Sequence, residues 1–88
     1  MRADRERVTR ALKIARGQID GVLRMIDDDR YCVEIANQLL ATEAILRKVN
    51  QEILQAHIRG CVAEALCTRE PQPKLEEALS LLEKMASR

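Results

Sequence analysis

The chain has 88 residues, a net charge of +1 and a single aromatic residue, Tyr31. The lack of Phe and Trp excludes the stacking platforms that hold single-stranded nucleic acid, and the length limits the surface that one copy can bury. The aliphatic and charged residues, with only three Gly and two Pro, are typical of an all-α fold.

The charge is distributed unevenly. Residues 1–25 contain seven Arg or Lys and three acidic residues, whereas the rest of the chain is mildly acidic. No apolar run approaches the length of a membrane span and the first residues lack the apolar stretch of a signal peptide, so we expect a cytoplasmic protein. In that reducing compartment, three cysteines favour metal or redox chemistry over structural disulfides.

The first helix is predicted over residues from about 4 to 27. Its apolar positions step by four and three, which places them on one helical face. They are Val8, Leu12, Ala15, Ile19, Val22 and Ile26. Gly17 and Gly21 are poor helix formers, so we expect close backbone packing there. The run Asp27–Asp29 is unfavourable at a helix C-terminus and marks the end of the helix.

A much longer helix is predicted from about 31 to 67, because the same stepping continues with no Pro in between. Its apolar face consists of Ile35, Leu39, Thr42, Leu46, Val49, Ile53, Ala56, Gly60 and Ala63. A helix of about 37 residues is roughly 55 Å long, far longer than a compact monomer of this size. Two such helices must pack in different chains, and an antiparallel dimer is the simplest closed form.

A third helix is predicted from about 73 to 87. Pro71 and Pro73 disfavour helix in the residues before them, so residues 68–73 form a turn. Pro73 can open the helix at its first position. The predicted buried positions are Leu75, Ala78, Leu82 and Met85.

The candidate metal ligands are Cys32, His57 and Cys61. His57 and Cys61 are four residues apart and share one face of the second helix, whereas Cys32 lies 25 residues before His57, about 37 Å along an unbroken helix. An antiparallel partner would place its own Cys32 beside His57 and Cys61. Two thiolates and one imidazole suit trigonal Cu(I), whereas Zn²⁺ usually needs a fourth ligand. Cys67 is rotated by about 240° from Cys61 and is left out.

The spacing alone leaves other interpretations open. Cysteines often pack in cores, and a single His on a helix is usually structural or solvated, so a purely structural helical oligomer is one alternative. A thiol sensor, in which Cys32 is oxidised or persulfidated and Cys61 resolves it, is a second. An enzyme with a Cys–His pair is disfavoured because no orienting group or deep pocket is evident.

Nearly the whole chain resembles the copper-sensitive operon repressors, relatives of bacterial nickel/cobalt, formaldehyde and persulfide sensors. The matching residues are Leu12, Lys13, Arg16, Gly17, Gln18, Asp20, Gly21, Arg24, Met25, Arg30, Tyr31, Cys32, Val33, Gln38, His57, Cys61 and Val62. The order Cys, His 25 residues later and Cys four further is the pattern of the copper branch. Nickel and cobalt sensors are richer in His, formaldehyde sensors usually lack the second Cys, and persulfide sensors usually lack the His.

The resemblance implies a three-helix protomer, an antiparallel dimer around the second helix and a flat tetramer of two dimers. It implies repression of copper-export genes, with Cys32, His57 and Cys61 as Cu(I) ligands. Tyr31 and Glu77 fall on the positions that surround the metal in the family.

The resemblance also implies that basic residues of the first two helices contact operator double-stranded DNA, without a helix-turn-helix. The candidates for phosphate contact are Arg10, Lys13, Arg16, Arg47 and Lys48. Members often carry Arg where this chain has Ala11, so its DNA contacts differ there. We expect the metal-free protein to bind DNA and Cu(I) to stabilise a form that does not.

Overall fold

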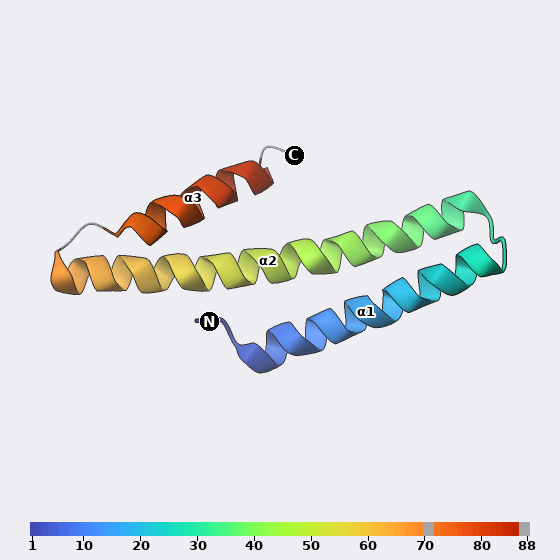
Figure 1. Cartoon of the computed structure of the whole chain (residues 1–88), viewed down its shortest axis with the longest axis horizontal. Coiled ribbons are helices and arrows are strands. Elements are labelled where there is room, and N and C mark those ends of the chain that lie inside the picture. The colour runs from blue at the N-terminus through green and yellow to red at the C-terminus, as the bar shows by residue number, and fades with distance from the viewer. Residues whose placement is uncertain (70–71, 87–88) are drawn as a thin grey trace. The chain divides into compact units, whose positions relative to one another are not determined.

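The computed structural model describes residues 1–69 and 72–86 and contains three helices, α1 (Arg5–Asp27), α2 (Cys32–Thr68) and α3 (Pro73–Ala86) (Figure 1). No strand occurs among these residues, so the predicted all-α class with three helices is confirmed. Pro71, in the predicted turn, and residue 87, the predicted end of the third helix, lie outside the described residues. Across the described ranges, no helix has the length and hydropathy needed to cross a membrane.

The chain divides into two compact units. We call residues 5–49 the α1–α2 unit, and residues 1–4 together with the described residues from 50 onward the α2–α3 unit. The long helix α2 contributes its first half to one unit and its second half to the other.

In the α1–α2 unit, α1 runs antiparallel to the first half of α2 (Figure 1). Every second member of the predicted α1 face is buried, namely Val8, Ala15 and Val22. The alternate members, Leu12, Ile19 and Ile26, are 41–55% exposed, so the single chain covers only half of this apolar face. A seam between only two helices is narrow, and here it buries one α1 residue in seven, which leaves the rest of the apolar stripe uncovered.

One polar contact lies inside this seam. Thr42 is only 4% exposed, and its Oγ1 donates a hydrogen bond to Gln18 Oε1 at 2.8 Å. The same hydroxyl lies 3.2 Å from the carbonyl oxygen of Gln38, one turn earlier in α2. Since buried polar atoms need partners, this contact fixes the register of α1 against α2.

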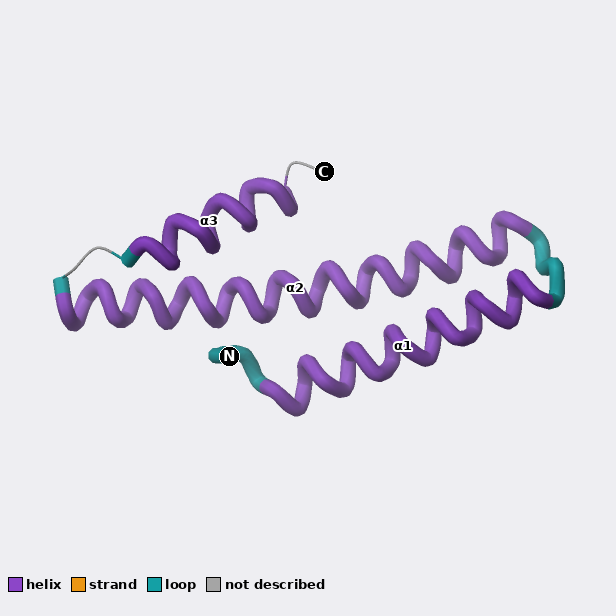
Figure 2. The backbone as a smooth tube through the Cα atoms, in the orientation of Figure 1, coloured by secondary structure: helices purple, strands orange, loops and turns teal. Residues whose placement is uncertain are grey.

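The connection between α1 and α2 is a four-residue turn that ends one helix and starts the next (Figure 2). Asp29 has a left-handed φ of 53°, its N–H donates to Ile26 O, and the N–H of Arg30 donates to Met25 O. This is the Schellman arrangement, which satisfies the last carbonyls of a helix. Arg30 also forms an ion pair with Glu34 at 2.8 Å, which joins the turn to the first turn of α2.

In the α2–α3 unit, α3 folds back along the second half of α2 (Figure 1). The buried residues are Leu54 and Cys61 from α2 and Ala78 from α3. The other predicted α3 positions, Leu75, Leu82 and Met85, are half-buried. Pro73 is the first residue of α3, in keeping with its fixed φ and its missing N–H.

The glycines depart from expectation. Among the described residues, a Cβ at Gly17 would meet nothing within 4 Å and one at Gly21 would meet only the end of Arg24, so the single chain does not show the close packing predicted there. The crowded glycine is Gly60, where a Cβ would collide with the Arg2 side chain.

Replacing Thr42 by Val tests the seam of the α1–α2 unit. The change keeps the shape but leaves Gln18 Oε1 without its donor, so we expect a loss of about 1 kcal/mol in unfolding free energy. For a domain of this size that lowers Tm by roughly 4–8 °C. The measurement is thermal unfolding by circular dichroism at one fixed protein concentration, with the exposed Thr9→Val as the matched control. Equal Tm values for the two variants would contradict the role of Thr42.

Candidate functional site

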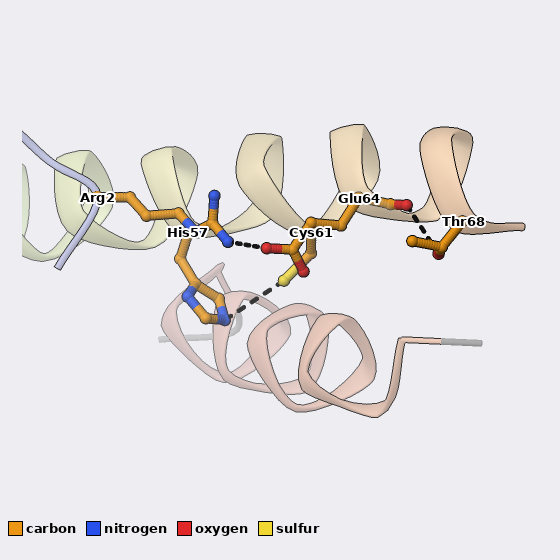
Figure 3. Close-up of polar contacts among 5 residues, drawn as sticks. All are labelled: Arg2, His57, Cys61, Glu64 and Thr68. Carbon is orange, nitrogen blue, oxygen red and sulfur yellow. Dashed lines mark hydrogen bonds and ion pairs between the residues drawn. The ribbon is translucent and has the colours of Figure 1, made fainter. Parts of the chain in front are cut away.

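His57 and Cys61 form the closest pair of candidate ligands. They lie one turn apart in α2, and the distance from Cys61 Sγ to His57 Nε2 is 3.6 Å. Both side chains point from α2 toward α3 (Figure 3). Cys61 is 3% exposed and His57 is half-buried, so the pair sits at the edge of the core of the α2–α3 unit.

The distance within this pair fits two ligands of one ion. A metal–nitrogen bond of about 2.0 Å and a metal–sulfur bond of about 2.3 Å, at an angle of roughly 110–120°, place the two donor atoms roughly 3.5–3.7 Å apart. The observed 3.6 Å lies in that range without any change of the two side chains. A thiolate and an imidazole also bind Cu(I) and Zn²⁺ better than they bind hard cations, which favour oxygen donors.

The third candidate ligand, Cys32, is the first residue of α2 and belongs to the α1–α2 unit. It is exposed. The structure does not bring Cys32 together with His57 and Cys61, and no group of three His, Cys, Asp or Glu that could hold a metal is found within residues 1–69 and 72–86. One chain therefore supplies two adjacent donors at one place and a single thiol elsewhere.

Tyr31 and Glu77, predicted to surround the metal, fall on different units. Tyr31 precedes α2 and its carbonyl oxygen accepts hydrogen bonds from the N–H groups of Glu34 and Ile35, while its side chain is 69% exposed. Glu77 is exposed on α3, in the same unit as His57 and Cys61.

The N-terminal segment adds residues that sequence reasoning missed. The guanidinium of Arg2 forms an ion pair with the carboxylate of Glu64, one turn beyond Cys61 in α2 (Figure 3). The Arg2 side chain crosses α2 at Gly60, where a Cβ would come within 3.0 Å of it. A glycine inside a strong helical pattern was the available signal, because such a glycine often marks a close approach.

The five candidate DNA contacts all lie in the α1–α2 unit and all are exposed. Arg10 and Lys13 line a shallow hollow of about 330 Å³ together with Arg5, Glu6 and Thr9. The remaining candidates are Arg16 on α1 and Arg47 and Lys48 on α2. Ala11, where the resemblance leads one to expect Arg, is half-buried.

Residues 4–84 match the family model described as metal-sensitive transcriptional repressor. The chain is 32% identical over 81 residues to the copper-sensing transcriptional repressor CsoR of Bacillus subtilis, covering 92% of this chain and 80% of that protein. It is 35% identical over 68 residues to the protein of the same name from Mycobacterium ulcerans, covering 77% of this chain. The chain spans only 58% of that mycobacterial relative.

Two solved structures resemble the fold. The copper-sensing repressor CsoR with Cu(I) from Geobacillus thermodenitrificans superposes with a TM-score of 0.80 at 34% identity, covering 92% of this chain and 84% of the other. The nickel-responsive transcriptional regulator InrS superposes with a TM-score of 0.76 at 25% identity, covering 100% and 94%.

The burial of Cys61 predicts an order of thiol reactivity. In the reduced, metal-free protein, iodoacetamide should modify the exposed Cys32 and Cys67 at least about tenfold faster than Cys61, because Cys61 must wait for a local opening. Peptide mass spectrometry over time gives the three rates separately. In concentrated urea the three rates should converge. Fast modification of Cys61 in the folded protein would contradict its burial between α2 and α3.

Proposed function

Because the chain belongs to the metal-sensitive transcriptional repressors, we propose that it is a repressor whose effector is Cu(I). The observation that carries this proposal is the His57–Cys61 pair, whose donor atoms are 3.6 Å apart. The names of its relatives and the Cu(I) in one similar structure favour copper over other metals and over the persulfide alternative.

Cu(I) would be held by His57 and Cys61 of one chain and by Cys32 of a second. The need for a second chain follows from helix geometry, because 25 residues of unbroken α-helix span about 37 Å. An antiparallel pair of α2 helices brings the start of one beside the far part of the other. Tyr31, next to Cys32, and Glu77 on α3 would then surround the ion.

Exposed apolar residues support self-association. In the α1–α2 unit the exposed set includes Leu12, Ile19, Leu23, Ile26, Leu39, Leu40 and Leu46. A monomer does not normally expose this many large apolar side chains on one compact unit. A second copy of the chain would cover them. The proposed assembly is an antiparallel dimer around α2 and a flat tetramer of two dimers.

The proposed response couples two equilibria. The metal-free assembly binds operator DNA through phosphate contacts from Arg10, Lys13, Arg16, Arg47 and Lys48. Joining Cys32 to the His57–Cys61 pair of another chain would favour a form in which α2 presents Arg47 and Lys48 differently. Coupling of this kind is reciprocal, so operator DNA must weaken Cu(I) binding by the same factor by which Cu(I) weakens DNA binding.

Anaerobic titration with Cu(I) tests the ligand set. We expect one Cu(I) per protomer, thiolate-to-copper absorption and a matching loss of operator binding in the same samples. Cys32→Ala, His57→Ala and Cys61→Ala should each lower Cu(I) affinity by at least the roughly 10- to 100-fold that changes beside a metal site cause. Cys67→Ala is the matched control and should behave as the parent protein.

The DNA readout separates the alternatives. Cys32→Ala should bind operator DNA and ignore copper. A second outcome is that the parent protein binds operator DNA in the presence of Cu(I) and releases it when polysulfide is added. That result would contradict the copper assignment and favour a sensor based on the thiol chemistry of Cys32 and Cys61.

The phosphate contacts predict a salt dependence. Replacing Arg47 and Lys48 by Ala should weaken operator binding and lower the slope of log K against log salt by about 0.9 for each phosphate that the variant no longer neutralises. Lys74→Ala, which removes a cation from α3, is the control and should leave the slope unchanged. Fluorescence anisotropy over a salt series measures both. Equal slopes for the two variants would contradict phosphate contacts from Arg47 and Lys48 of α2.

A further inference from the structure

The N-terminal segment lies against the part of α2 that carries the His57–Cys61 pair. Residues 1–4 belong to the α2–α3 unit, apart from α1, which they precede in the chain. Arg2 reaches along α2 and pairs with Glu64, and the side chains of Arg2, His57 and Cys61 are seen together in Figure 3. The segment is therefore attached to α2 by a side-chain contact 62 residues away in sequence.

Gly60 makes this attachment possible. A Cβ at that position would come within 3.0 Å of Cδ, Cζ and Nη1 of Arg2, a distance that real Cβ atoms essentially never show. The neighbouring atoms belong to the outer part of a flexible side chain, so a larger residue would displace Arg2 and leave α2 intact. Glycine is a poor helix former, and its presence in the middle of α2 is explained by the Arg2 side chain that crosses it.

The crossing point borders the candidate ligands. Gly60 lies three residues after His57 and directly before Cys61, and residues three or four apart are neighbours on a helix surface. Glu64 lies three residues after Cys61, on the same side of the helix. Of the three cysteines, Cys61 is the buried one.

We propose that residues 1–4 form a strap, closed by the Arg2–Glu64 ion pair over Gly60, that restricts the access of small solutes to Cys61. The proposal deepens the function proposed above, because the same strap would slow the exchange of Cu(I) with competing thiols and chelators. The closure itself needs no metal and is a property of the free protein.

The strap is weakly closed. Arg2 and Glu64 are 46% and 49% exposed, and exposed ion pairs shift an equilibrium by at most about fivefold. It therefore opens often, and high salt opens it further by screening the pair. Such a strap slows access to Cys61 without blocking it.

The test is the rate at which iodoacetamide modifies Cys61 in the reduced, metal-free and untagged full chain. Arg2→Ala and Gly60→Ala should each raise that rate by about two- to fivefold, and about 0.5 M salt should raise the rate of the parent protein toward theirs. Arg2→Lys, which keeps the cation, should stay near the parent rate. Gly17→Ala is the matched control, since a Cβ there meets nothing within 4 Å.

The exposed Cys67 serves as an internal reference in each sample, and its rate should not change. Gly60→Ala also controls for faster alkylation caused by partial unfolding, because alanine favours the helix and should not lower Tm. Equal Cys61 rates in the parent, Arg2→Ala and Gly60→Ala proteins would overturn the strap.

A second measurement links the strap to the metal. Removal of Cu(I) by a bathocuproine chelator should be faster in Arg2→Ala and Gly60→Ala than in the parent and Gly17→Ala proteins, by the same factor of about two to five. Failure of the parent protein to bind Cu(I) would overturn the proposed function and leave the alkylation result standing. Faster alkylation with unchanged Cu(I) removal would overturn the extension of the strap to metal exchange.

Discussion

The continuity of α2 is the constraint on which the other features depend. One helix runs from Cys32 to Thr68 without a break, so residues at its start and residues in its second half belong to different compact units. Two side chains of one helix can touch each other only when they are within about four residues in sequence. Cys32 and the His57–Cys61 pair can act on one ion only if another chain brings them together, and in a metal site of that kind the bound ion would itself join two chains.

This constraint also explains why the α1–α2 unit is so apolar on its outside. Two paired helices bury a narrow seam, here Val8, Ala15 and Val22 opposite a half of α2 that includes Thr42. The alternate residues of the same stripe stay exposed in the single chain, and the proposed self-association would cover them. In such an assembly the stability of the protomer would depend on the protein concentration.

The sequence predicted the helices well and the side-chain environment less well. Periodicity of three and four, the proline that opens α3 and the acidic run at the end of α1 are local signals, and each acts within a few residues of the feature that it marks. The pairing of His57 with Cys61 was predictable for the same reason. The exposure of Leu12 and Ile19 was not, because the width of a buried stripe depends on how many helices cover it. The contact of Arg2 with Glu64 could not be predicted either, since it joins residues 62 apart in sequence and no helical periodicity marks it.

Cys61 combines a packing role with a proposed ligand role at one position. It is 3% exposed and belongs to the core that α2 shares with α3, and its sulfur faces His57 at the distance of a shared ligand. A substitution there would change the packing of α3 as well as the proposed donor pair, so few residues could satisfy both requirements. The exposed Cys67 is under neither requirement, so a substitution there is expected to leave both the packing of α3 and the proposed donor pair unchanged.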